Sequence, residues 1–197
     1  MTRPVTQSNT APLPPHFSMR PDHVLLLPGW YDSGSGHWQS RWEQLHDYHR
    51  VAQHDWERPL RGDWSARLEE VVLSRQEPVL LVAHSLGCLL VAAWASHSRH
   101  AARVRAALLV APGDAERPEL QWQLRSWSPI IRQRLPFPTL LVGSRNDPFC
   151  RFERAQGLAA DWGARFHDAG EAGHINAESG LGDWAEGHAL LATLISE

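Results

Sequence analysis

The feature that most constrains this chain is the stretch Val79–Ala93, V-L-L-V-A-H-S-L-G-C-L-L-V-A-A. Its first five residues form a continuous run of aliphatic side chains, which is typical of a strand buried on both faces. After four residues the chain resumes as a second run that is apolar on nearly all sides, which suits a helix packed deep inside a domain. The pattern therefore predicts a buried strand, a sharp turn and a buried helix, with Ser85 on the turn.

The turn resembles a nucleophile elbow, in which a strained strand-to-helix turn exposes a serine hydroxyl at the carboxyl edge of a sheet. The usual pattern is G-x-S-x-G, and this chain has Ala83-His84-Ser85-Leu86-Gly87. Small residues flank the serine because Cβ atoms would clash across the turn, and alanine is the next smallest choice after glycine. In the alternative interpretation, Ser85 only caps the N-terminus of the helix, a common role for serine.

Strands and helices are expected to alternate along the chain, with no internal repeat. The expected strands are Val24–Leu27, Tyr48–Gln53, Val79–Ala83, Val104–Val110, Thr139–Gly143 and Arg165–His167. The expected helices are His37–His46, Trp64–Arg75 with Asp63 as N-cap, the run after Gly87, Arg151–Ala160 and Asp183–Ile195. This order predicts an α/β fold in three layers, with a doubly wound, mainly parallel sheet of about six strands. One domain is expected over residues 22–197, after a flexible, proline-containing tail over residues 1–21.

Composition limits the classes of partner. The formal net charge of −3 and the scattered basic residues argue against nucleic acid and against an acidic membrane surface. No apolar run reaches transmembrane length, and the first 21 residues lack the apolar core of a signal peptide. Cys88 and Cys150 are the two cysteines, and they form neither a metal-binding pattern nor a disulfide framework. We therefore expect a cytoplasmic protein.

A serine nucleophile needs a base, and the base needs an acid that orients it. In doubly wound hydrolases these residues follow the serine in the order acid, then histidine. Asp147 and His174 fit this order, and each lies in a loop after a predicted strand. Taken singly, an aspartate before proline is commonly a turn residue, and one of twelve histidines near a glycine is unremarkable. Asp168 competes for the role of the acid, but it follows the last strand rather than the one before it.

The other expected site residues flank the elbow and the loop after the first strand. The backbone N–H groups of Leu86 and Trp30 are the predicted oxyanion hole. Substrate contacts are expected from Gly29, Trp30, His84, Trp122 and Trp127, although large tryptophans more often pack in cores. The irregular, proline-interrupted stretch 114–136 takes the place of a lid domain, which favours small acyl groups.

With these residues in hand, the chain resembles the retinoblastoma-binding protein 9 / YdeN family of small serine hydrolases, within the α/β-hydrolase superfamily. The resemblance implies a compact, lidless fold with Ser85 as nucleophile, Asp147 as acid and His174 as base, without metal or cofactor. Ala83 departs from the glycine found in many α/β hydrolases. The retinoblastoma-pocket motif L-x-C-x-E is incomplete, so binding to such a pocket is not expected. The matching blocks are Leu27–Trp30, Gly36–Gln39, Asp55-Trp56, Pro59, Asp63-Trp64, His84–Cys88, Asn146–Pro148 and Gly173–Asn176.

Two other enzyme classes fit poorly. Gly29 and Gly34 have the spacing that begins a phosphate-binding loop, but the lysine and hydroxyl residue that hold phosphate and magnesium are missing. His46 and His49 have no second ligand pair for a metal.

The sequence thus predicts a serine hydrolase that cleaves a small carboxylic ester, or alternatively a thioester or amide. The remaining alternative is a binding module with an idle triad, and the oligomeric state is left open.

Overall fold

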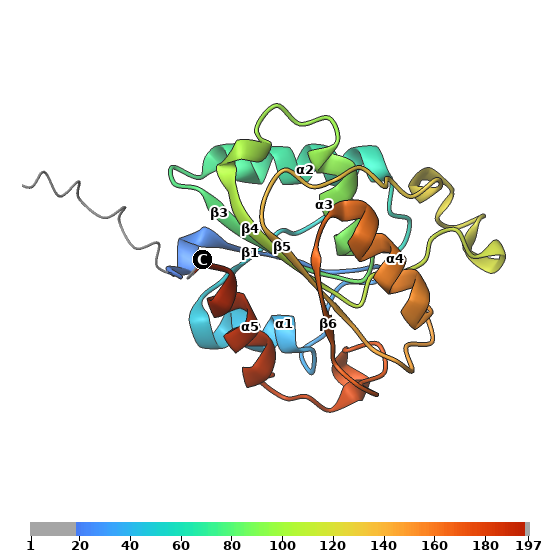
Figure 1. The fold of residues 1–197 in the computed structure, drawn as a ribbon. Helices are drawn as coiled ribbons and strands as arrows, with labels where there is room; N and C mark the ends of the chain where they lie inside the picture. The colour runs from blue at the N-terminus through green and yellow to red at the C-terminus, as the bar shows by residue number, and fades with distance from the viewer. Residues whose placement is uncertain (1–18, 196–197) are drawn as a thin grey trace, which may run out of the picture.

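A computed structural model describes residues 19–195, in which six strands form one sheet in the order β2-β1-β3-β4-β5-β6 (Figure 1). Every neighbouring pair in this sheet is parallel. The strands are β1 (Val24–Leu27), β2 (His49–Arg50), β3 (Val79–His84), β4 (Val104–Val110), β5 (Thr139–Gly143) and β6 (Arg165–Asp168). The helices are α1 (Trp38–His46), α2 (Arg61–Ser74), α3 (Leu86–Ala95), α4 (Phe152–Trp162) and α5 (Ala185–Ile195). The predicted three-layer α/β fold with a parallel sheet is confirmed.

Each face of the sheet is covered by helices, and each face has its own hydrophobic core. Helices α2, α3 and α4 cover one face, and α1 and α5 cover the other (Figure 1). Along β1, Leu25 and Leu27 belong to the first core, whereas Val24 and Leu26 belong to the second. This alternation follows from the two-residue period of a strand, and burial on both faces explains why the strands read as unbroken apolar runs.

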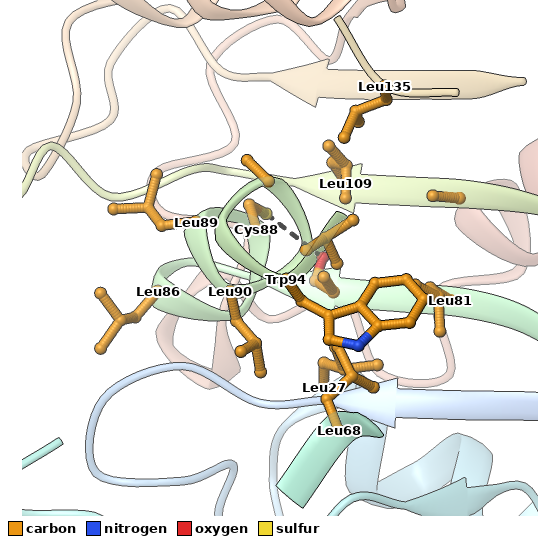
Figure 2. Close-up of a cluster of buried hydrophobic side chains, with 14 of the residues drawn as sticks. Leu27, Leu68, Leu81, Leu86, Cys88, Leu89, Leu90, Trp94, Leu109 and Leu135 are labelled. Carbon is orange, nitrogen blue, oxygen red and sulfur yellow. Dashed lines mark hydrogen bonds between the residues drawn. The ribbon is translucent and has the colours of Figure 1, made fainter. Parts of the chain in front are cut away.

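Helix α3 lies at the centre of the first core. Leu27, Leu81 and Leu109, from three neighbouring strands, surround it together with Leu68 of α2 (Figure 2). Gly87 permits this close packing, because a Cβ atom at that position would lie 2.3 Å from the carbonyl oxygen of Leu27. The first turn of α3 therefore lies directly against the end of β1, which holds the turn that carries Ser85.

Predicted boundaries fail where burial is weak. The strand expected over Tyr48–Gln53 shrinks to His49–Arg50, because β2 is an edge strand paired only with β1. Asp63 was expected to cap α2, but the helix begins at Arg61 and Asp63 lies within its first turn. There its carboxylate is still favourable, since it faces the positive end of the helix dipole.

Most of the tail predicted over residues 1–21 lies outside the described residues. The last residue of that range, Pro21, begins the short 3₁₀ helix η1 (Pro21–His23) ahead of β1. None of the helices in the described range is both long and apolar enough to span a bilayer.

Candidate active site

The site lies where neighbouring strands send the chain to opposite faces of the sheet. After β1 the chain passes to α1 on one face, and after the adjacent β3 it passes to α3 on the other. Such a switch point opens a crevice at the carboxyl ends of the strands. Gly29 follows β1 and Ser85 follows β3, so both lie at this crevice.

Ser85 adopts a backbone conformation that is unfavourable for a residue with a side chain, with φ 55° and ψ −119°. It stands at the N-cap position of α3, yet its hydroxyl caps no backbone N–H of the helix. Instead, Ser85 Oγ lies 3.0 Å from His174 Nε2. The alternative interpretation, in which Ser85 is simply a helix cap, does not fit this geometry.

The predicted acid and base are also in contact. His174 Nδ1 lies 3.0 and 2.9 Å from the two carboxylate oxygens of Asp147. Because a carboxylate only accepts hydrogen bonds, Nδ1 carries the proton and Nε2 is free to accept the Ser85 hydroxyl. Asp147 Oδ1 further accepts the backbone N–H of Phe149, which fixes the carboxylate. The rival acid, Asp168, forms an ion pair with Arg145 and has no hydrogen bond to His174 in the described part of the chain.

The loop that carries His174 is fixed on both sides of that residue. Asn146 Oδ1 accepts the N–H of Gly173 at 2.7 Å, which links the loop to the turn after β5. Trp38 of α1 donates its indole N–H to the carbonyl oxygen of Ile175 at 2.8 Å. The imidazole is therefore held by its backbone neighbours as well as by Asp147.

His84 occupies the last position of β3, directly before Ser85, and is only 5% exposed. Its Nε2 lies 2.9 Å from the carbonyl oxygen of His174. A carbonyl oxygen accepts, so Nε2 of His84 is the donor and carries the proton. Burial, and secondarily the charge of a protonated His174, hold the pKa of His84 well below its ordinary value, so the ring is neutral.

His37, which the sequence interpretation did not single out, caps the N-terminus of α1 and borders the same crevice. Its Nδ1 accepts the N–H of Gln39 at 3.1 Å, an unusual use of histidine as a helix cap that no common sequence pattern indicates. Burial lowers the pKa of His37 to about 3, with smaller contributions from Arg50 and His174. Its ring contacts that of His84, with centroids 4.6 Å apart.

A cavity of about 450 Å³ opens at Ser85. Of the residues predicted to contact substrate or stabilise an oxyanion, Gly29, Trp30, His84 and Leu86 line it. Neither the N–H of Trp30 nor that of Leu86 has a hydrogen-bond acceptor within residues 19–195. Both amides are thus unpaired donors beside the serine. The remaining apolar wall, which sequence patterns did not identify, comes from Tyr31, Leu120, Leu124, Phe149 and Ala115.

The two tryptophans expected in the pocket wall lie elsewhere, which corrects that prediction. Trp127 is 1% exposed, stacks edge-on against Trp64 and donates its indole N–H to the carbonyl of Pro59. Trp122 is 87% exposed and does not border the cavity. Leu120 and Leu124 of the same irregular stretch line the cavity in their place. In residues 19–195, no three or more His, Cys, Asp or Glu side chains are grouped so that they could hold a metal ion.

The parallel sheet, the strained serine turn after β3 and the histidine loop after β6 together define an α/β hydrolase. The model of the serine hydrolase family matches residues 24–193. The chain therefore belongs to the serine hydrolase family, and it is a hydrolytic enzyme.

Solved structures agree with this assignment. A YdeN-like hydrolase of Pectobacterium atrosepticum is 34% identical, with a TM-score of 0.77 over 88% of this chain and 90% of that one. The ydeN gene product of B. subtilis is 18% identical, with a TM-score of 0.69 over 88% and 98% of the two chains. An esterase domain of a Rhodothermus marinus protein, 16% identical with a TM-score of 0.65 over 90% and 88%, shares the fold. The comparison with curated proteins found no match.

Proposed function

We propose that this serine hydrolase cleaves small carboxylic esters through an acyl-enzyme intermediate on Ser85. The observation that carries the proposal is the unbroken series of contacts from Ser85 Oγ to His174 Nε2, 3.0 Å, and from His174 Nδ1 to Asp147, 2.9 Å. A serine hydroxyl is a weak nucleophile unless a neighbouring base takes its proton, and this series provides that base and its orienting acid.

The reaction follows from the proton positions. Ser85 Oγ attacks the ester carbonyl while its proton passes to His174 Nε2, and Asp147 stabilises the imidazolium that forms. The N–H groups of Leu86 and Trp30 donate to the negative oxygen of the tetrahedral intermediate. The C–O bond to the alcohol then breaks, and the alcohol leaves with the proton from Nε2. Water then attacks the acyl carbonyl while its proton passes to His174 Nε2, and His174 returns that proton to Ser85 Oγ as the acyl bond breaks. The carboxylic acid is released and the serine hydroxyl is restored.

The walls of the cavity favour a small, largely apolar acyl group. At about 450 Å³ the space is near the lower end of ligand pockets. Leu120, Leu124 and Phe149 supply apolar surface for such a group. Thioesters and amides present the same carbonyl to Ser85, so they differ from esters in the leaving group that must accept the proton from His174.

Covalent labelling and ester hydrolysis test the proposal together. A fluorophosphonate probe should label the wild-type protein and fail to label Ser85→Ala. On short-chain p-nitrophenyl esters, Ser85→Ala and His174→Ala should lower kcat by roughly 10³-fold or more, because such residues act as a unit. Ser74→Ala is the matched control, since that hydroxyl only donates to Val71 within α2. Equal rates for Ser85→Ala and wild type would reject the mechanism, and absent labelling of a folded wild-type protein would favour a binding module.

A further inference from the structure

We propose that His84 is a positioning residue that sets the distance between the nucleophile and the base. This role for His84 rests on the proposed function of Ser85 and His174. It is a role in their alignment rather than in substrate contact. His84 is joined to Ser85 by a peptide bond, and its ring donates a hydrogen bond to the backbone carbonyl of His174. One side chain thus connects the end of β3 with the loop that carries the base.

The contact is direct and short. His84 Nε2 lies 2.9 Å from the His174 carbonyl oxygen, across 90 residues of sequence. Other hydrogen bonds hold this loop from elsewhere in the fold, since Ser144 and Asn146 follow β5 and Trp38 belongs to α1. His174 Nε2 contacts Ser85 Oγ for proton transfer, and in the described residues the bond from His84 is the hydrogen bond that ties the backbone of His174 to β3.

The ring of His84 is itself in contact with other rings. Its centroid lies 4.6 Å from that of His37 and 4.8 Å from that of His174. Phe149 contacts His174 at 4.6 Å between centroids. His37 is fixed in turn by its cap bond from Gln39. These contacts leave the His84 ring little freedom to rotate away from the carbonyl.

A neutral His84 suits this role. A neutral imidazole has a single N–H, and the His174 carbonyl requires that it be on Nε2. Burial keeps the pKa of His84 well below its ordinary value, so the ring stays neutral and places no positive charge beside the imidazolium that forms at His174. Loss of the donor would leave a buried carbonyl unpaired and free the loop to move.

Two substitutions separate the hydrogen bond from the volume of the ring. His84→Leu removes the donor, whereas His84→Gln places an amide N–H at a similar reach. We expect His84→Leu to lower kcat about 10- to 100-fold with KM changed less than about threefold, since a small misplacement of reacting groups has effects of this size. His84→Gln should recover most of this loss. His188 lies on α5 and forms a hydrogen bond with Tyr48, so His188→Leu is the matched control and should leave kcat close to the wild-type value.

The outcomes distinguish this role from a merely structural one. If His84→Leu and His84→Gln lose the same kcat, or if the loss appears only in KM, the proposal is overturned. Melting temperatures of all three variants identify any loss that is due to unfolding. A failure of the proposed function would appear differently, as wild-type protein that neither hydrolyses esters nor reacts with the fluorophosphonate probe.

A measurement on the wild-type protein covers the case in which His84 variants do not fold. Correlation spectra of ¹⁵N-labelled imidazoles report which ring nitrogen carries the proton, without any requirement for activity. We expect His84 to be a neutral ring protonated at Nε2 from pH 6 to pH 8, with slow exchange of that proton. Protonation at Nδ1, or a ring that is doubly protonated in this range, would contradict the proposal.

Discussion

At the scale of single residues, the conformation of Ser85 indicates where the chain accepts strain. A positive φ in a residue with a side chain costs free energy of order 1–3 kcal/mol, and such strain persists only where surrounding contacts enforce it. Here Gly87 packs against the end of β1, and the N–H of Ser85 donates to the carbonyl of Val110 on β4. The turn is therefore clamped between two strands, and the hydroxyl is directed toward His174 instead of the helix N-terminus.

At Gly29 an added methyl group would press directly on the nucleophile. A Cβ atom at Gly29 would lie 2.7 Å from Ser85 Cβ and 3.2 Å from Ser85 Oγ. We expect Gly29→Ala to displace the nucleophile and lower kcat/KM for short p-nitrophenyl esters by about 100-fold. Gly36→Ala, in the same loop, is the matched control because its Cβ would make only an ordinary 3.6 Å contact with Ala177. Equal activities of the two variants would contradict this account of the turn.

At the scale of secondary structure elements, burial decides what sequence patterns can predict. The strands at Val24–Leu27, Val104–Val110 and Thr139–Gly143 have the predicted bounds, because strands covered on both faces consist of continuous apolar runs. The edge strand β2 has no such run to define its ends. Tryptophan is ambiguous for another reason: its large apolar ring suits a core and a pocket equally, so Trp127 could not be assigned from sequence.

The contact between α3 and β1 yields a prediction about stability. A Cβ atom at Gly87 would lie 2.3 Å from Leu27 O and 2.9 Å from Pro28 O, and these backbone atoms cannot move aside without disturbing β1. Gly87→Ala should therefore lower the free energy of unfolding by about 3 kcal/mol in urea denaturation. Gly157→Ala on the exposed face of α4, where nothing lies within 4 Å, should raise it by about 0.5–1 kcal/mol. Similar effects of the two substitutions would refute a role for close packing at Gly87.

At the scale of the whole molecule, the sheet brings together residues that are far apart in sequence. The order of Ser85, Asp147 and His174, each after its own strand, could be predicted because parallel strands have their carboxyl ends at one edge. The supporting contacts could not be predicted from sequence. The helix cap provided by His37 and the hydrogen bond from His84 to His174 both depend on side-chain packing between α1, β3 and the last loop. No sequence period encodes packing of that kind.

Buried histidines at this edge also link the stability of the whole fold to pH. Burial holds the pKa of His37 at about 3, compared with 6.5 in its ordinary state, and lowers that of His84 in the same direction. Above pH 6.5 these rings are neutral in both the folded and the unfolded chain, so their contribution to stability is fully present. As pH falls from 6.5 toward 3, the unfolded chain binds protons that the folded chain does not, and that contribution is lost.

The size of this effect can be measured with His37→Asn, which keeps an acceptor for the N–H of Gln39 but does not titrate. Below pH 6.5, each such histidine should add about 1.4 kcal/mol per pH unit to the slope with which the unfolding free energy falls. The slope for His37→Asn should therefore be smaller than that of the wild type by about this amount. Urea denaturation between pH 7 and pH 4 at constant ionic strength provides the comparison. Trp38→Phe removes the hydrogen bond to Ile175 without changing any titrating group, so its curve should run parallel to that of the wild type. If His37→Asn also runs parallel to the wild type, the ring of His37 takes up its proton equally in the folded and unfolded chains, and the acid sensitivity arises elsewhere in the fold.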